Sequence, residues 1–260
     1  MKNVEATLLG VLGHPIAHSQ SPELFSQILA AEGRNDVSYI PFDLPRIEDF
    51  PAFTENHPNL VGLNVTVPYK QAILPMLSDV SEEARSVGAV NTLVKTKRGW
   101  EGHNTDIWGF RRSIQPFLTN HHERALVLGT GGSASAVHFV LSSLGIETTS
   151  VSRDGDSSRG TRACGRMSIG YHELSEWVVR HHLLVVHCTP VGMHPKHQDM
   201  VPFPANLLTS DHLVVDLIYN PAETRFLHEA KRQGASILNG RDMLRLQAEK
   251  AWDIWKTSGV

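Results

Sequence analysis

The sequence has little cysteine, little net charge and no long apolar run, and each of these absences excludes a class of protein. Cys164 and Cys188 are its only cysteines, so neither a disulfide framework nor a C-x-x-C motif is available. The formal charge is −3 at pH 7, with no lysine- or arginine-rich run, which argues against nucleic acid and anionic membrane surfaces as partners. No apolar stretch approaches the roughly 18 residues of a membrane span, and no signal-peptide layout is present. We therefore expect a cytoplasmic protein.

Histidine, by contrast, is abundant, with 15 residues, which raises the question of a metal site. The adjacent pairs His121-His122 and His181-His182 would point to opposite faces of an extended chain and make poor two-ligand clamps. His194 and His197 lie in a Pro-rich loop without an accompanying carboxylate motif. We expect no metal.

A glycine-rich loop, Gly129-Thr130-Gly131-Gly132-Ser133-Ala134, stands between an apolar run and a helical pattern that stops at Gly145. Strand, glycine turn and helix are the context of the G-x-G-x-x-G/A dinucleotide-binding fingerprint. In that fingerprint Gly129 allows the tight turn, Gly131 leaves room for a pyrophosphate, and Ala134 keeps helix and strand close. The phosphates would lie on the N-terminus of the following helix. A plain strand-to-helix turn is the alternative interpretation.

The chain alternates apolar strands with amphipathic helices, which is typical of an α/β fold with largely parallel sheets. We expect an α/β substrate-binding domain over residues 1–105, completed by a C-terminal helix within 239–260. A doubly wound, Rossmann-type dinucleotide-binding domain is expected over residues 106–238. The last helix should begin near Asp242 and pack back on the first domain.

Several polar residues lie where packing alone does not require them. Ser19 and Ser21 flank a predicted helix start after the first strand, where open α/β sheets bind ligands and hydroxyls suit a carboxylate. Thr66 and Lys70 follow the third strand, and a lysine in a partly buried cleft can take part in proton transfer.

Three further polar residues extend this set. Asn91 lies inside a predicted strand, Ala89–Val94, Asp106 begins a helix, and Gln247 has apolar neighbours one turn away on the last helix. Simpler interpretations exist: Ser21 and Asp106 as helix N-caps, Lys70 as a solvated lysine, and Gln247 as an exposed glutamine. Together, one lysine, one carboxylate and several neutral hydrogen-bonding groups suit a small polyhydroxylated acid. The residues alone predict a nucleotide-dependent oxidoreductase acting on a small polar substrate.

Six motifs, in order along nearly the whole chain, resemble those of the shikimate dehydrogenase family. They are Gly13–Pro22 (S-x-S-P), Asn64–Lys70 (N-V-T-x-P-x-K), Gly88–Thr92 (G-A-V-N-T), Gly102–Asp106 (G-x-N-T-D), Asp216–Pro221 (D-x-x-Y-x-P) and the segment Asn239–Ala248. The resemblance implies reversible, NADP-dependent reduction of 3-dehydroshikimate to shikimate in the shikimate pathway of aromatic amino acid biosynthesis. We expect a monomer or homodimer.

The resemblance also implies roles for individual residues. Ser19, Ser21 and Tyr219 would hold the substrate carboxylate. Its ring hydroxyls would contact Thr66, Lys70, Asn91, Asp106 and Gln247. Lys70 and Asp106 would form the catalytic pair, the ammonium stabilising charge on the reacting oxygen and the carboxylate orienting the hydroxyl. Which of the two transfers the proton stays open. Beyond the glycine loop, the cofactor would contact Ser152, Arg153, Thr189, Met193, Leu217 and Gly240.

The cofactor side departs from the family pattern in two places. Where the family often has N-R-T, this chain has Ser152-Arg153-Asp154. Arg153 is placed to clamp a 2′-phosphate, whereas Asp154 could accept from a free ribose 2′-hydroxyl, and Arg159 is off the usual spacing. We expect NADP, with NAD as the alternative. His187 stands where the family usually has asparagine, although Met193 and the turn before it are retained.

Two other functions are compatible with the same residues. The nearer one is a quinate dehydrogenase, or a dual quinate/shikimate dehydrogenase, possibly using NAD. The other is a dehydrogenase-like protein that senses substrate or nucleotide without turnover. Such a sensor could lose Lys70 or Asp106, and both are present here.

Overall fold

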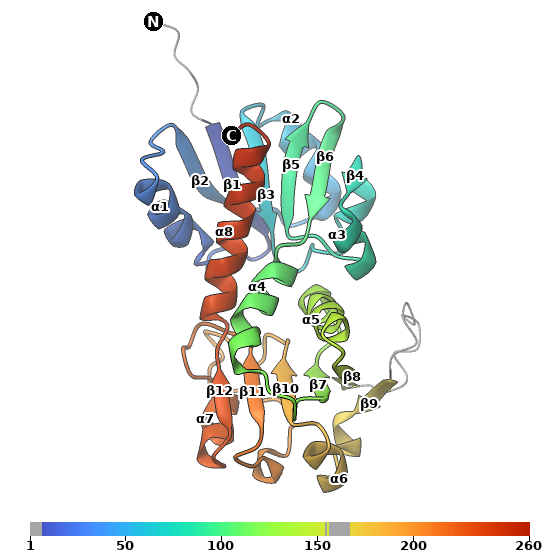
Figure 1. The fold of residues 1–260 in the computed structure, drawn as a ribbon. Helices are drawn as coiled ribbons and strands as arrows, with labels where there is room; N and C mark the ends of the chain where they lie inside the picture. Colours follow the sequence, from blue (N-terminus) through green and yellow to red (C-terminus); the bar gives the residue numbers. More distant parts are fainter. Residues whose placement is uncertain (1–6, 154, 156–166) are drawn as a thin grey trace, which may run out of the picture. The chain divides into compact units, whose positions relative to one another are not determined.

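The computed structural model describes residues 7–153, 155 and 167–260. Asp154, Arg159 and Cys164 lie outside the described residues. The chain divides into two compact units, Met1–Gly109 with Arg245–Val260, and Phe110–Leu244 (Figure 1). Both divisions fall inside helices, α4 (Asp106–Ile114) and α8 (Arg241–Thr257).

The first unit is built on a six-stranded sheet with the order β2-β1-β3-β5-β6-β4. Its strands are β1 (Thr7–Gly13), β2 (Val37–Asp43), β3 (Leu60–Val65), β4 (Asp79–Val80), β5 (Thr92–Thr96) and β6 (Gly99–His103). The strands β1, β2 and β3 are parallel, and β5 runs antiparallel to both of its neighbours. The turn at Lys97 and Arg98 joins β5 to β6. A turn this short can join only antiparallel strands.

Helices cover both faces of this first sheet (Figure 1). Side chains of α1 (Ser21–Ala31) and α8 join one core cluster, and those of α2 (Phe50–Glu55) and α3 (Glu82–Val87) join the other. Single 3₁₀ turns lie at Ile47–Asp49 and Leu74–Met76. Trp255 of α8 is fully buried and donates its indole N–H to the carbonyl of Leu93 at 2.9 Å. The last helix therefore packs directly on the first sheet.

Three polar residues of the first unit are placed differently from the sequence-based expectation. Helix α1 begins at Ser21 with Gln20 as N-cap, so Ser21 is not the cap. Asp106 is not the cap of α4 either, because the side-chain oxygen of Asn104 accepts from the amide of Ile107 at 3.3 Å. The carboxylate of Asp106 is thereby left for other partners. Asn91 precedes β5, which begins at Thr92, rather than lying inside a strand.

The second unit contains six parallel strands in the order β12-β11-β10-β7-β8-β9. They are β7 (Arg124–Leu128), β8 (Glu147–Ser152), β9 (Met167–Gly170), β10 (Leu184–His187), β11 (Leu213–Asp216) and β12 (Ser236–Leu238). Counted from β7, this is the 3-2-1-4-5-6 order of doubly wound dinucleotide-binding domains, read from the other edge. The predicted α/β fold class is confirmed. Strand β9 was not predicted, because its four residues alternate too briefly to show a pattern.

After α4, the described part of the second unit contains α5 (Gly132–Ser143), α6 (Glu176–Arg180) and α7 (Arg225–Arg232), with 3₁₀ turns at Gln115–Phe117, Tyr171–Glu173 and Ala205–Leu207. Helix α7 begins at Arg225, because Thr224 caps it by accepting from the amide of Leu227. Phe226 and Leu227 pack on Val185 and Val214 in one core cluster, while α5 packs against β7 and β8.

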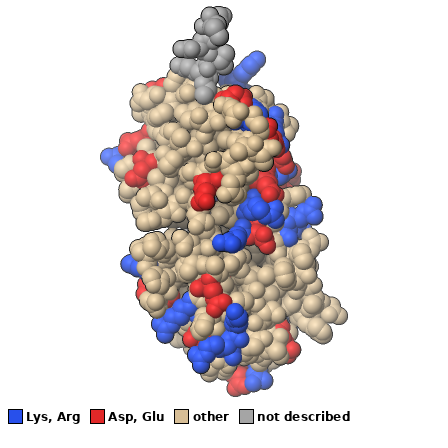
Figure 2. Space-filling view, turned by 90° about the vertical axis from the view of Figure 1, so that its left-hand side faces the viewer, with Lys and Arg blue, Asp and Glu red and all other residues tan. Residues whose placement is uncertain are grey.

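On the surface that Figure 2 shows, acidic and basic side chains lie in mixed groups separated by uncharged areas. Within the described part of the chain, no helix has both the length and the apolar character needed to cross a membrane.

Candidate active site

Two loops of the first unit follow the carboxyl ends of β1 and β3 and lie on the same side of the sheet, because these strands are parallel neighbours. One loop carries Ser19 and leads into α1 at Ser21, and the other carries Thr66 and Lys70. The loops are joined by backbone hydrogen bonds, from His14 N–H to the Val67 carbonyl at 3.2 Å and from Thr66 N–H to the Leu12 carbonyl at 2.9 Å. Ser19 Oγ accepts from the amide of Ser21 at 3.3 Å.

Lys70 and Asp106 form an ion pair in this unit. Lys70 Nζ lies 2.6 Å from Asp106 Oδ2, and the two side chains are 15% and 6% exposed. The alternative of a solvated lysine therefore does not hold. The contact and the burial are observed, and the catalytic role of the two residues stays a prediction.

Asn91 orients the carboxylate of this pair. Its amide nitrogen donates to Asp106 Oδ1 at 2.8 Å, and its amide oxygen accepts from the backbone N–H of Thr105 at 2.7 Å. The same nitrogen lies 3.3 Å from Gln247 Oε1. Gln247 is only 8% exposed, so the interpretation as a surface glutamine is excluded. Four predicted residues, Lys70, Asn91, Asp106 and Gln247, are thus connected by hydrogen bonds.

The network continues through residues that the sequence analysis did not assign to the site. Asn64 donates to the Asn91 carbonyl and to Thr92 Oγ1, both at 3.2 Å, and accepts from the Tyr39 hydroxyl at 2.8 Å. Burial raises the pKa of Tyr39 well above its ordinary value, opposed by a hydrogen bond with Ser21. Tyr39 thus connects the Ser21 loop to the amide network. The available signal was Asn64, a polar residue inside an apolar strand.

His103, at the end of β6, is the titratable group nearest in sequence to Asp106. Burial lowers its pKa below the ordinary value, and this effect is partly opposed by Glu101, whose carboxylate is 3.3 Å from its ring. A lowered pKa favours the uncharged form of the His103 ring.

The glycine loop of the second unit lies at the carboxyl end of β7, beside β10, where the strand order reverses. Gly129 has φ +115°, a conformation that favours glycine, and a Cβ there would meet the methyl group of Thr189. Gly131 has an ordinary φ of −78°, and a Cβ there would meet no atom within 4 Å. Neither conformation nor packing requires glycine at 131. The open space in front of it fits the approach of a pyrophosphate.

Other predicted cofactor residues follow the ends of the same parallel strands. Ser152 ends β8, and its buried hydroxyl has no hydrogen-bond partner within the described chain. Arg153 is exposed immediately after it, and Met193 is 40% exposed after β10. Gly240 lies so close to Leu217 that a Cβ would overlap the Leu217 carbonyl. An orphaned buried hydroxyl at a strand end fits a site that a nucleotide completes.

Tyr219, the remaining predicted substrate residue, follows β11 in the second unit, where it is half-buried. Among residues 7–153, 155 and 167–260, no cluster of three or more histidine, cysteine or acidic side chains could hold a metal ion.

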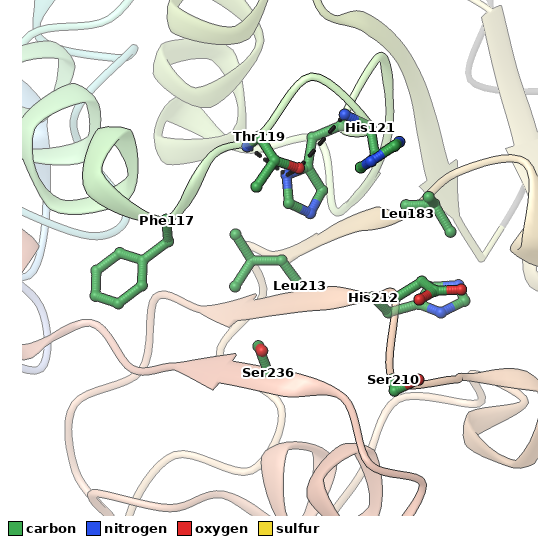
Figure 3. Close-up of a pocket in the computed structure, with 10 residues that line it drawn as sticks. Phe117, Thr119, His121, Leu183, Ser210, His212, Leu213 and Ser236 are labelled. Atoms are coloured by element: carbon green, nitrogen blue, oxygen red, sulfur yellow. Dashed lines mark hydrogen bonds between the residues drawn. The ribbon is translucent and has the colours of Figure 1, made fainter.

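A cavity of about 440 Å³ opens at the amino ends of the strands of the second sheet, where β7, β10, β11 and β12 begin. Figure 3 shows Thr119 and His121 on one side, Leu213 in the middle, and Ser210 and Ser236 on the other side. None of the predicted site residues lines it. Ligands of doubly wound folds bind at the carboxyl ends of the strands, so this cavity does not correspond to the dinucleotide site.

A doubly wound sheet with a glycine loop at its switch point, in one chain with a buried lysine–aspartate pair, defines a nucleotide-dependent oxidoreductase. Comparisons with known proteins agree. Residues 11–93 match the model of the shikimate dehydrogenase substrate binding domain. The chain is 37% identical over 262 residues to shikimate dehydrogenase (NADP(+)) of Crocosphaera subtropica, covering 95% of this chain and 90% of that one.

Solved structures extend the similarity to the whole fold. Shikimate dehydrogenase of Aquifex aeolicus matches with a TM-score of 0.86 and 32% identity, over 100% of this chain and 96% of that one. The Thermus thermophilus enzyme in complex with NADP(H) and shikimate matches with a TM-score of 0.84 and 33% identity, over 96% of this chain and 93% of that one. Quinate dehydrogenase of Corynebacterium glutamicum in complex with NAD matches with a TM-score of 0.82 and 31% identity, over 97% of this chain and 94% of that one. The chain belongs to the shikimate dehydrogenase family, as its motifs indicated.

Proposed function

We propose that this protein catalyses the reversible, NADP-dependent reduction of 3-dehydroshikimate to shikimate. The observation that carries the proposal is the Lys70–Asp106 ion pair, whose carboxylate accepts a hydrogen bond from Asn91. This chain is also 37% identical to a shikimate dehydrogenase (NADP(+)). The reaction belongs to the shikimate pathway of aromatic amino acid biosynthesis. A cytoplasmic location and a monomeric or homodimeric state are part of the same proposal.

Lys70 acts at the reacting oxygen. When bound, NADPH supplies the hydride that reduces the substrate carbonyl carbon. The ammonium of Lys70 stabilises the negative charge that develops on the oxygen and donates the proton that completes the hydroxyl. In the oxidation direction, the same amine accepts that proton.

Asp106 acts through orientation and charge. Its carboxylate contacts an ammonium at 2.6 Å and an amide N–H at 2.8 Å, so both of its oxygens already accept. A protonated carboxyl group would lose the attraction to the ammonium. We therefore assign the proton transfer to Lys70. Asp106 holds the lysine in place and accepts a hydrogen bond from a substrate hydroxyl.

The remaining polar residues bind the substrate. Ser19 and Ser21, with Tyr219, hold the carboxylate, and Thr66, Asn91 and Gln247 contact the ring hydroxyls. Deep burial of Asn91 and Gln247 among other hydrogen-bonding groups fixes the direction of their amides. Fixed amides favour a substrate whose hydroxyl pattern matches them, because a mismatched one leaves buried polar groups unpaired.

The cofactor we propose is NADP. The glycine loop, Gly129 to Ala134, would hold the pyrophosphate, and Ser152 and Arg153 would face the adenosine ribose. Thr189, Met193, Leu217 and Gly240 would surround the nicotinamide side. Arg153 is exposed directly after β8, where its guanidinium can pair with a 2′-phosphate. The second candidate is a quinate or dual dehydrogenase using NAD, and the quinate dehydrogenase neighbour favours it.

One assay tests both candidates. The formation of reduced cofactor is followed at 340 nm with shikimate or quinate as substrate and NADP or NAD as cofactor, in all four combinations. We expect the highest kcat/KM for shikimate with NADP. A higher value for quinate or for NAD would establish the second candidate. Binding of both ligands with no turnover in any combination would contradict enzyme function and favour a sensor.

A further inference from the structure

His187 is a fully buried histidine at the end of β10, and the proposed reaction does not use it. It is 1% exposed, and its ring meets Phe226 edge-on at 5.6 Å between centroids. Nδ1 lies 3.0 Å from Asp216 Oδ1, within ion-pair distance although out of line for a hydrogen bond. Nε2 is hydrogen-bonded with Thr189 Oγ1. One imidazole thus connects the ends of two neighbouring strands to the loop after β10.

Asp216, which the His187 ring contacts, is itself held in place by hydrogen bonds. Its carboxylate is completely buried, Oδ1 accepts from the amide of Ile218 at 3.0 Å, and Oδ2 accepts from the Thr224 hydroxyl at 2.6 Å. Thr224 in turn caps α7 by accepting from the amide of Leu227. A buried carboxylate with this many donors is held in one position.

Thr189 links His187 to the loop after β10. Its hydroxyl is hydrogen-bonded with Nε2 of His187. Thr189 Oγ1 also accepts from the amide of Val191 at 3.3 Å. His187 thereby fixes the rotamer of Thr189 and the turn that follows it.

Thr189 is held from its other side by the glycine loop. Its methyl carbon would lie 2.9 Å from a Cβ at Gly129, so methyl group and loop are in close packing. With the hydroxyl fixed by His187 and the methyl against Gly129, Thr189 has a single position at the switch point of the sheet.

We propose that His187 is a positioning residue for the dinucleotide: anchored on Asp216, it holds Thr189 and the turn to Gly192 in the conformation that binds the cofactor. The inference rests on the proposed function for the identity of the ligand. Without the hydrogen bond between His187 and Thr189, the turn from Thr189 to Gly192 would have to become ordered when the cofactor binds, which weakens binding. A typical hydrogen bond contributes about 1 kcal/mol, which corresponds to a dissociation constant raised about 5-fold.

Two variants of His187 distinguish the role of Nδ1 from that of Nε2. His187→Asn places an amide where Nδ1 stands and is too short to reach Thr189, whereas His187→Gln can extend to the Nε2 position. Thr189→Val keeps the methyl contact with Gly129 and removes the hydroxyl. The dissociation constant of NADP is measured by calorimetry, without turnover. The melting temperature of each variant reports on folding.

We expect His187→Asn and Thr189→Val each to raise the dissociation constant about 5-fold, and the double variant to raise it no further. In His187→Gln the dissociation constant of NADP should stay within about 2-fold of the parent value, and kcat at saturating NADP should hold in both His187 variants. Independent, multiplying effects, or an unchanged constant in Thr189→Val, would overturn the inference. Thr189→Val alone decides the question if the His187 variants do not fold. A parent protein that binds neither NADP nor NAD would instead overturn the proposed function.

Discussion

Lys70 Nζ lies 2.6 Å from Asp106 Oδ2, although the two residues are 36 positions apart and belong to a loop and a helix. Both side chains are largely withdrawn from water. Stability alone is a poor explanation for such a pair, because desolvation of two charges offsets most of their attraction. An ion pair kept at this cost, with Asn91 aligning its carboxylate, indicates chemistry at this point of the first unit.

Asp106→Asn should lower kcat for shikimate oxidation about 100-fold. The variant keeps the side-chain shape and removes the charge that holds the Lys70 ammonium, and positioned acid–base groups contribute about 10² to 10⁴ in rate. If the two residues act as one unit, the Lys70→Ala/Asp106→Asn double variant should be no slower than the slower single variant. Steady-state kinetics of the three proteins decide this, and multiplying losses would show that the residues act independently.

Gly131→Ala separates a ligand-binding glycine from a structural one. Since φ is −78° and no atom lies within 4 Å of the added methyl, the free energy of unfolding should stay within about 1 kcal/mol of the parent value. The dissociation constant of NADP should rise about 10-fold, because the methyl occupies the space for the pyrophosphate. As a matched control, Gly62→Ala places a methyl against the Trp255 indole and should destabilise by about 1–3 kcal/mol. Unchanged NADP affinity in Gly131→Ala would exclude this loop as the pyrophosphate site.

Much of the fold could be predicted from local patterns. The glycine loop, flanked by an apolar strand and a helical pattern, predicted the positions of β7 and α5. The elements that were missed are short. Strands β4 and β9 and helix α2 have two to six residues, and their patterns are too brief to show a period.

The polar network could be predicted only in part. Lys70, Asn91, Asp106 and Gln247 come from recognisable motifs, and the structure joins them. Which atom caps α4 depends on competition between Asn104 and Asp106, and only the folded loop decides it. Tyr39 was not assigned to the site because its hydroxyl, on β2, reaches Asn64 on β3 across the intervening strand β1, a contact with no signature in the sequence.

Arg153→Ala should reduce the preference for NADP over NAD about 10-fold to 100-fold. A guanidinium–phosphate contact contributes about 1.5–3 kcal/mol, and NAD has no 2′-phosphate to make it. Arg124→Ala is the matched control, because Arg124 is also an exposed arginine of the second unit but begins β7 instead of following a strand end. The measurement is kcat/KM for each cofactor at saturating shikimate. Equal ratios in parent and Arg153→Ala would place 2′-phosphate recognition elsewhere.

His122 should make the second unit less stable in mild acid. Burial, followed by the charges of His121 and His212, lowers its pKa from the ordinary 6.5. Below pH 6.5 the unfolded chain therefore binds more protons than the folded one, so the free energy of unfolding falls as the pH falls towards the lowered value. In His122→Asn the amide oxygen can still accept from the Thr119 N–H, as Nδ1 does at 3.0 Å, but the titration is gone.

Urea denaturation at pH 8.0, 6.5 and 5.5 checks this. The parent and His122→Asn should be equally stable at pH 8.0, which shows that the Thr119 contact is kept. The parent should lose more stability than the variant by pH 5.5. Parallel pH profiles would show that His122 does not carry the effect.

The most direct test of the account is single-turnover hydride transfer from shikimate to NADP in Lys70→Met, which keeps much of the apolar length of the lysine side chain and removes its ammonium. The rate is followed at 340 nm by stopped flow, and the dissociation constant of shikimate is measured separately. We predict a rate lowered at least about 1,000-fold, with shikimate affinity changed less than about 5-fold. A rate close to that of the parent, with the loss confined to shikimate affinity, would contradict the role of Lys70 in proton transfer.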